Sequence, residues 1–330
     1  PEQLFAMGYA ACFDNALPVA AKQLKLAPTA TKTSVEVGMK LALQYWAQNG
    51  QPDRCIFIAL EDAFHGETLG VAALGGVEVF RQPFSKVLLE CQRIPSPAAE
   101  GGSVAALAKL RELLEVDASR VAALVVEPMV QGAAGMQIYD ADFLVGARRL
   151  CDEFDIFLIC DEVFSGYGRT GPMWACEHAK VAPDIVCTAK GFSGGMLPMA
   201  ATLTTNRIFE GFLGDPARAF YYGHTFCGNP LGAAVALEVL SVFEDEGIIE
   251  AAKSKADRIA DVFREMAGWP GVSRTRSLGM VGACDLEGDS GYLADVGWRV
   301  FEEARVRGAY LRPLGNVVYV TPSLNIPDAD

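Results

Sequence analysis

Short apolar runs alternate with longer amphipathic runs along most of the chain. Four short runs are apolar at successive positions, which is typical of strands buried on both faces of a parallel sheet. They are Cys55–Leu60, Val121–Val126, Phe157–Cys160 and Ile185–Thr188. Such alternation predicts an α/β domain with a mostly parallel central sheet, sandwiched by helices on right-handed crossovers.

Between these runs, apolar residues recur at the spacing of a single helical face, which we expect to pack on the sheet. One predicted face carries Val35, Met39, Ala42, Leu43 and Trp46, and a second carries Val104, Leu107, Leu110 and Leu114.

The pattern changes after about residue 243. A helix over 230–243 ends at an acidic run, and the elements that follow are a helix near 249–267, a glycine-rich strand near 278–285, a helix near 292–307 and a strand near 317–320. This order predicts a smaller α+β domain. We therefore expect a large domain over residues 1–243 and a small C-terminal domain over residues 244–330.

Composition narrows the class of protein. Half of the 330 residues are apolar, so a large core is possible, and a net charge of −13 disfavours nucleic acid as a partner. No apolar run approaches the roughly 20 residues that span a bilayer, and the first residues do not resemble a secretory signal. We expect no membrane partner.

The nine cysteines form no Cys-x-x-Cys pair, and several lie inside apolar runs. That usage is typical of reduced, buried thiols, and it predicts a cytoplasmic protein without a metal site.

Asp161 ends an apolar strand, at the edge where open α/β sheets bind ligands. A carboxylate there requires a cationic partner or water, and a protonated pyridine ring would be such a partner. Alternatively, Asp161 caps a following helix.

Lys190 also follows an apolar strand, and Gly/Ser-rich residues come after it. A lysine partly removed from water can form a Schiff base through its neutral amine. Because one crossover separates Asp161 from Lys190, they can lie on neighbouring strand ends and face the same ligand. The alternative for Lys190 is a solvated surface residue.

A third segment, Gly223–Pro230, leads into a helix. Its hydroxyl, on Thr225, is a candidate phosphate contact beside a helix start, next to His224. Asn229 as the N-cap and Pro230 at the first helical position give an ordinary capped loop, and both interpretations can hold.

Two more residues fit such a site. Phe64 could stack on a flat ring, or be a core aromatic. Arg312 could bind a substrate carboxylate, or be a surface arginine.

Together these motifs resemble the class III aminotransferases, of fold type I among enzymes that depend on pyridoxal 5′-phosphate (PLP). The resemblance runs from about Val35 to the last residue. It is densest in Val126–Met136, Asp161–Val163, Gly166–Gly171, Trp174–His178, Thr188–Gly191 and Thr225–Pro230. Met39–Trp46 and Tyr310–Gly315 favour the branch of this family that acts in biotin synthesis.

The resemblance implies a role for each matching residue. Lys190 would be the Schiff-base lysine and the acid/base of the proton shift, and Asp161 would bind the pyridine nitrogen. The other expected cofactor contacts are Phe64, Val163, His224, Thr225, Thr31 and Lys32, and the expected substrate contacts are Arg312, Gly223, Phe64 and Tyr319.

The same resemblance implies S-adenosylmethionine as amino donor and 8-amino-7-oxononanoate as acceptor. It also implies a homodimer with shared active sites, in which Thr225 touches the phosphate of the partner's cofactor.

The chain departs from the family pattern in three places. Thr31 and Lys32 replace a Gly-Ser pair that holds the phosphate, and we find no counterpart of the family's upstream segment or of its final helix. These departures leave two alternatives open: another class III ω-aminotransferase with an ω-amino acid donor, or a catalytically impaired PLP-binding remnant.

Overall fold

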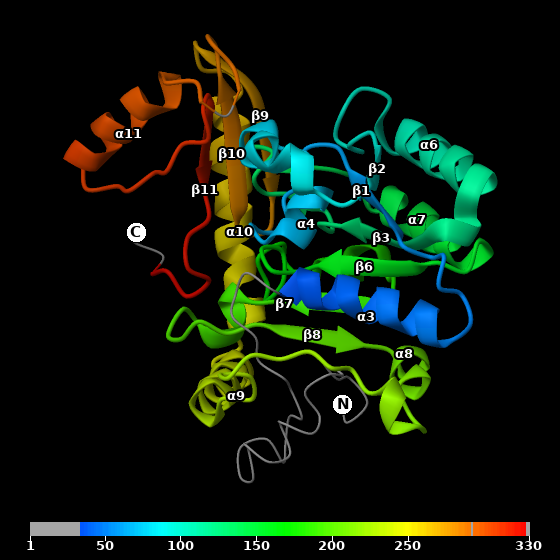
Figure 1. Cartoon of the computed structure of the whole chain (residues 1–330). Coiled ribbons are helices and arrows are strands. Elements are labelled where there is room, and N and C mark those ends of the chain that lie inside the picture. The colour runs from blue at the N-terminus through cyan, green and yellow to red at the C-terminus, as the bar shows by residue number, and fades with distance from the viewer. Residues whose placement is uncertain (1–33, 292, 328–330) are drawn as a thin grey trace.

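The computed structural model describes residues 34–291 and 293–327 and contains a six-stranded sheet in the order β2-β1-β3-β6-β7-β8 (Figure 1). In that order the strands are Cys91–Ile94, Ile56–Leu60, Val121–Val126, Phe157–Asp161, Ile185–Thr188 and Ala201–Thr204. Neighbours pair in parallel, except that β8 is antiparallel to β7. The predicted α/β fold with a mostly parallel sheet is confirmed.

Both faces of this sheet are buried, because successive strand residues point to opposite sides. Phe57 and Ala59 of β1 join the core under α3 (Ser34–Gln48), whereas Ile58 and Leu60 join the core under α6 and α7. Two short helices, α4 (Leu69–Leu74) and α8 (Asn206–Gly211), share the side of α3. The opposite side is covered by α6 (Gly102–Asp117) and α7 (Ala141–Glu153).

The predicted apolar face of α6 is wrong at Val104, which is 80% exposed, whereas Leu110 and Leu114 are buried and Leu107 is half-buried. At about 100° per residue, Val104 lies roughly a third of a turn from Leu110, the middle of the buried face. Ala106 takes the place in the core that Val104 was expected to fill.

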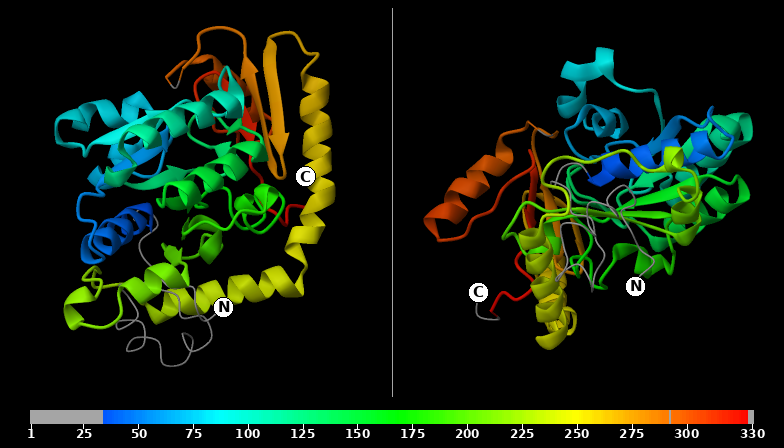
Figure 2. Two further views of the ribbon diagram at one scale, coloured as in Figure 1. Left: turned by 90° about the vertical axis from the view of Figure 1, so that its right-hand side faces the viewer. Right: turned by 60° about the horizontal axis from the view of Figure 1, so that its bottom comes forward.

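After β8 and the short helix α8, the chain continues into two long helices, α9 (Pro230–Asp245) and α10 (Ile248–Met266). They lead into an antiparallel sheet, in the order β11-β10-β9, with α10 along one side of it (Figure 2). The remaining elements of this part are β9 (Val272–Leu278), β10 (Val281–Leu286), α11 (Val296–Val306) and β11 (Val317–Val320). The expected domain boundary at residue 243 falls in the last turn of α9 and stays a prediction.

Short elements complete the connections. They are α5 (Glu78–Arg81), β4 (Val130–Gln131), β5 (Gln137–Ile138) and the 3₁₀ helices η2 (Gln82–Val87), η3 (Ala118–Arg120), η4 (Ala175–Ala179), η5 (Lys190–Ser193) and η6 (Pro216–Arg218). Across the described part of the chain, no helix is both long and apolar enough to cross a membrane.

Two arginines join the smaller sheet to loops of the larger one. Arg169 donates to the carbonyl oxygens of Met280 and Pro322, at 3.3 Å and 2.6 Å. Arg276, from β9, donates to the carbonyl oxygens of Gly135 and Met136, the latter at 2.7 Å. These bonds join β9, the turn between β9 and β10, and the segment after β11 to loops of the large sheet.

We predict that Phe157→Ala lowers the free energy of unfolding by about 3–5 kcal/mol, because Phe157 is fully buried and its ring stacks on Trp46. Val104→Ala is the control, and the exposed position should keep its effect within about 0.5 kcal/mol. Denaturant titration measures both. Equal losses from the two substitutions would contradict this description of the core.

Candidate active site

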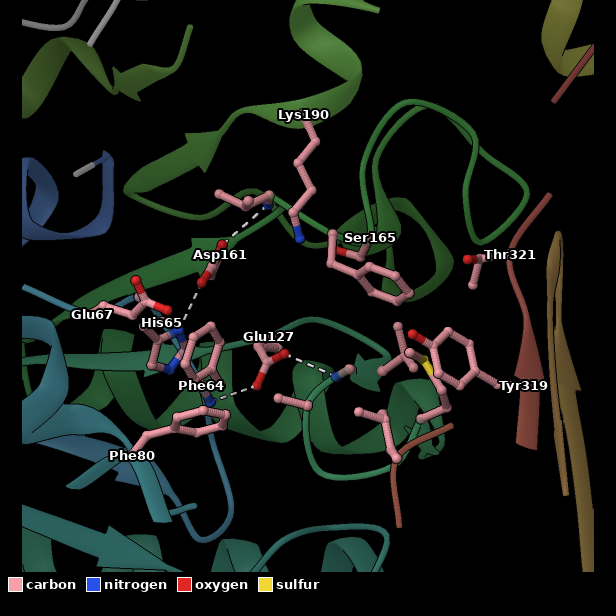
Figure 3. Close-up of a pocket in the computed structure, with 18 of the residues that line it drawn as sticks. Phe64, His65, Glu67, Phe80, Glu127, Asp161, Ser165, Lys190, Tyr319 and Thr321 are labelled. Carbon is pink, nitrogen blue, oxygen red and sulfur yellow. Dashed lines mark hydrogen bonds and ion pairs between the residues drawn. The ribbon is translucent and has the colours of Figure 1, made fainter. Parts of the chain in front are cut away.

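A pocket of about 490 Å³ lies at the carboxyl edge of the large sheet (Figure 3). Four neighbouring strands of that sheet each deliver a polar residue to it at or beyond their carboxyl ends. Glu127 follows β3 directly, Asp161 ends β6, Lys190 lies two residues after β7, and His65 lies in the loop after β1. This edge is where open α/β sheets place their ligands. Since β6 and β7 are paired neighbours, Asp161 and Lys190 share the pocket.

Asp161 is almost fully buried and both of its oxygens accept hydrogen bonds. Oδ2 lies 2.8 Å from Nδ1 of His65, and Oδ1 accepts the backbone N–H of Val163 at 3.1 Å. With a proton on Nδ1, His65 donates to Asp161 and fixes the orientation of the carboxylate. The pocket thus presents an oriented anion in apolar surroundings, which favours a cationic ligand atom.

His65 is itself fully buried. Burial lowers the pKa of the imidazole, but the hydrogen bond to Asp161 and the charge of that carboxylate outweigh it, so the pKa is raised. Its Nε2 has no hydrogen-bond partner among the described residues. The hydrogen bond to Asp161 therefore favours the protonated form of His65 more than burial alone would allow.

Glu127 forms a second buried acid beside this pair. Its carboxylate accepts the backbone N–H groups of Phe64 and Gly132, each at 3.0 Å, and so joins two loops of the pocket wall (Figure 3). Burial raises the pKa of Glu127 to about 7; the charge of His65 lowers it and that of Asp161 raises it further.

Lys190 extends from its turn into the pocket from the side opposite Phe64 (Figure 3). Its Nζ lies 5.4 Å from the centre of the Phe164 ring, within the range of a cation–π contact. The residue as a whole is exposed, which leaves the amine accessible to a ligand.

Most of the residues singled out from the sequence meet in this pocket. Lys190, Asp161, Phe64, Val163, Arg312 and Tyr319 all line it. Tyr319 comes from β11 and Arg312 from the segment before it, so the smaller sheet supplies one wall.

Gly223, His224 and Thr225 do not line the pocket. They are exposed on the segment that precedes α9. The Asn229 side chain accepts the backbone N–H of Leu231 at 3.0 Å, so the expected helix cap is present. Thr31 and Lys32 lie outside the described residues.

The described residues fit a flat, anionic, pyridine-type cofactor. Phe64 and Val163 offer apolar surfaces, Asp161 offers an anion for the ring nitrogen, and Lys190 offers an amine. Ser34, the first residue of α3, also lines the pocket, where the positive end of the helix dipole favours a phosphate.

Sequence reasoning missed His65, Glu127 and Ser34 as parts of this site. Glu127 follows the buried run Val121–Val126 just as Asp161 ends its own strand, so the same signal could have found it. His65 carries no local signal, because its partner is 96 positions away.

The family model described as "Aminotransferase class-III" matches residues 10–330. Adenosylmethionine-8-amino-7-oxononanoate aminotransferase of Geobacter sulfurreducens is 40% identical over 314 residues, which cover 89% of this chain and 69% of that protein. The enzyme of the same name from Nitratidesulfovibrio vulgaris is 38% identical over 90% of this chain and 58% of its own length. Against this second relative, the chain spans little more than half of the protein.

Solved structures give the same result. The aminotransferase of that name from Methanocaldococcus jannaschii superposes with a TM-score of 0.87 at 33% identity, over 94% of this chain and 75% of the other. A PLP-bound amine transaminase from an uncultivated Pseudomonas species gives 0.86 at 30% identity, over 92% and 73% of the two chains. The fold type expected from the resemblance is confirmed.

We predict that the cofactor-free protein loses stability as pH rises from about 4.5 towards about 7, since buried Glu127 keeps its proton in this range whereas the same group ionises in the unfolded chain. The stabilising contribution of Glu127 is fully present below about pH 4.5, the ordinary pKa of a glutamate. It falls as pH rises towards about 7, the pKa of Glu127 in the folded protein, with a slope of up to about 1.4 kcal/mol per pH unit. Glu127→Gln should flatten this slope in denaturant titrations, whereas exposed Glu100→Gln should not. An unchanged slope in Glu127→Gln would refute the assignment.

Proposed function

The chain belongs to the class III aminotransferases, which depend on PLP, and we propose that it transfers an amino group from S-adenosylmethionine to 8-amino-7-oxononanoate. The product would be 7,8-diaminononanoate, in biotin biosynthesis. One observation carries this proposal: Lys190 and Asp161 meet in a single pocket of a chain whose curated relatives bear that enzyme's name.

When bound, PLP supplies an aldehyde that links to amines and a ring that withdraws electrons from the reacting carbon. In our proposal Asp161, oriented by His65, holds the proton on the pyridine nitrogen and keeps the ring electron-poor. Val163 and Phe64 line the cofactor faces. The amino end of α3 at Ser34 supports the phosphate.

Lys190 has two tasks in this proposal. Its Nζ would hold the cofactor, and its amine would move a proton between the donor Cα and C4′ of the cofactor. Both tasks require Nζ to reach the same few atoms. The short span between the ends of β6 and β7 supports that requirement.

The acceptor's carboxylate would bind Arg312, whose guanidinium can form paired hydrogen bonds to it. Arg312 and Tyr319 lie in the wall supplied by the smaller sheet, and Phe64 offers an apolar surface for the acceptor's carbon chain.

We further infer a homodimer in the cytoplasm. Gly223, His224 and Thr225 are exposed outside the chain's own pocket, which agrees with a role in the partner's site. Seven described cysteines, Cys55, Cys91, Cys151, Cys160, Cys176, Cys187 and Cys284, are free thiols, which is the usage of a reducing compartment. The division into a large domain and a small one near residue 243 belongs to the same proposal.

A second candidate is an ω-aminotransferase with another donor, favoured by the 30% identity to the Pseudomonas amine transaminase. An assay of S-adenosylmethionine, β-alanine and 4-aminobutyrate against 8-amino-7-oxononanoate, with added PLP, separates the two. We expect diaminononanoate only with S-adenosylmethionine. Turnover with the ω-amino acids alone would favour the second candidate, and stoichiometric PLP binding without any half-reaction would indicate an impaired remnant.

We predict that Lys190→Ala abolishes turnover and the visible absorbance of the lysine-linked cofactor, because no other described residue that lines the pocket carries a primary amine. Activity and absorbance spectra measure the loss. Transamination by the variant at the normal rate would show that Lys190 is not the attachment site.

Arg312→Gln should raise the KM for 8-amino-7-oxononanoate by about tenfold or more and leave the KM for the donor nearly unchanged, since a charge-assisted bond is worth about 1.5–3 kcal/mol. Arg299→Gln, an exposed arginine on α11, is the control. If both substitutions leave the acceptor KM unchanged, Arg312 does not bind the carboxylate.

A further inference from the structure

Lys190 has an unusual backbone conformation. Its φ is +45°, in the left-handed region that residues with a side chain rarely adopt. Such a conformation is unfavourable and persists only where neighbouring groups enforce it. The preceding residue, Ala189, is extended, so the backbone changes from extended to left-handed at Lys190.

A close contact lies one residue further on, at Gly191. A Cβ atom on Gly191 would lie 2.8 Å from Cδ2 of Tyr167 and 2.9 Å from its Cβ and Cγ. No side chain fits at that distance, so the Tyr167 ring lies flush against the Gly191 backbone. The ring is 5% exposed and belongs to the loop that follows β6, the strand that ends at Asp161.

Tyr167 is itself held firmly. Its ring packs edge-on against Trp174 at 5.0 Å and against Phe243 of α9 at 6.2 Å, and it stacks on Phe192 at 6.2 Å. Its own φ is +57°, so this residue also depends on its surroundings to keep its conformation.

The loop that carries Tyr167 is closed by a buried acid, Glu162. Its carboxylate accepts the Ser165 hydroxyl at 2.7 Å and the backbone N–H groups of Ala175 and Cys176 at 3.0 Å and 2.9 Å. One side chain thereby fixes both ends of the loop.

We propose that Tyr167 is a positioning residue for Lys190: its ring supports the Gly191 backbone, holds the turn left-handed and so directs the lysine amine into the pocket. This inference rests on the proposed role of Lys190 as the attachment site. It extends that role to Tyr167, which lies in the loop after β6. The geometry of that loop therefore controls the direction of the Lys190 amine, although Lys190 itself follows β7.

Capture of PLP as a borohydride-reducible imine on Lys190, located by peptide mass, tests the inference without any substrate. Tyr167→Leu removes the platform and should slow capture about tenfold, which corresponds to about 1.4 kcal/mol of lost preorganisation. Tyr167→Phe keeps the ring and should stay within about twofold of the parent rate. Gly191→Ala, with the ring intact, should slow capture as Tyr167→Leu does.

Tyr45→Leu is the matched control. Tyr45 also packs against a glycine, since a Cβ on Gly211 would lie 2.3 Å from its Cε2, but neither residue lines the pocket. Tyr45→Leu should lower the unfolding temperature and leave the capture rate unchanged.

Parent-like capture by Tyr167→Leu, or slowing no greater than in Tyr45→Leu, would overturn the inference. Slowing by Tyr167→Phe equal to that by Tyr167→Leu would also overturn it, because the hydroxyl would then be the active group. If the parent protein forms its imine on another lysine, the proposed role of Lys190 fails as well, and the peptide mass distinguishes this case.

Discussion

The site depends on one constraint, the parallel pairing of β6 with β7. Because the two strands run in the same direction, Asp161 and Lys190 emerge at the same edge of the sheet, with the opposite chemistry that a PLP-type ring requires at its two ends. Both strands are almost wholly buried, so a slide by one residue would exchange the side chains that pack in the two cores on either side of the sheet. The core of the protein thereby sets the register of the active residues.

Other residues orient and support the side chains that this pairing brings together. His65 orients the carboxylate of Asp161, and Glu127 joins the loops that follow β1 and β3. In our proposal, Tyr167 supports the turn of the lysine. The smaller sheet contributes Arg312 and Tyr319 to the opposite wall, held in place by Arg169 and Arg276. In this arrangement the large sheet presents the cofactor residues, and the smaller sheet presents the residues proposed to select the substrate.

The sequence predicted the central strands well because their burial on both faces leaves an uninterrupted apolar run. It failed at the edges of the sheet: Cys91–Ile94 and Ala201–Thr204 include polar residues, so their apolar signal is short. Val272–Leu278 was missed because polar residues occupy most of its positions. For the site, residues at the ends of buried runs were found, whereas the partnership of His65 with Asp161 and the left-handed turn at Lys190 arise only from tertiary packing.

A crystal structure of the protein with PLP tests the central claim most directly. The account predicts electron density continuous from Nζ of Lys190 into the cofactor, with the pyridine nitrogen about 3 Å from the Asp161 carboxylate and the phosphate near Ser34. Density joined to a different lysine, or a ring whose nitrogen points away from Asp161, would contradict it.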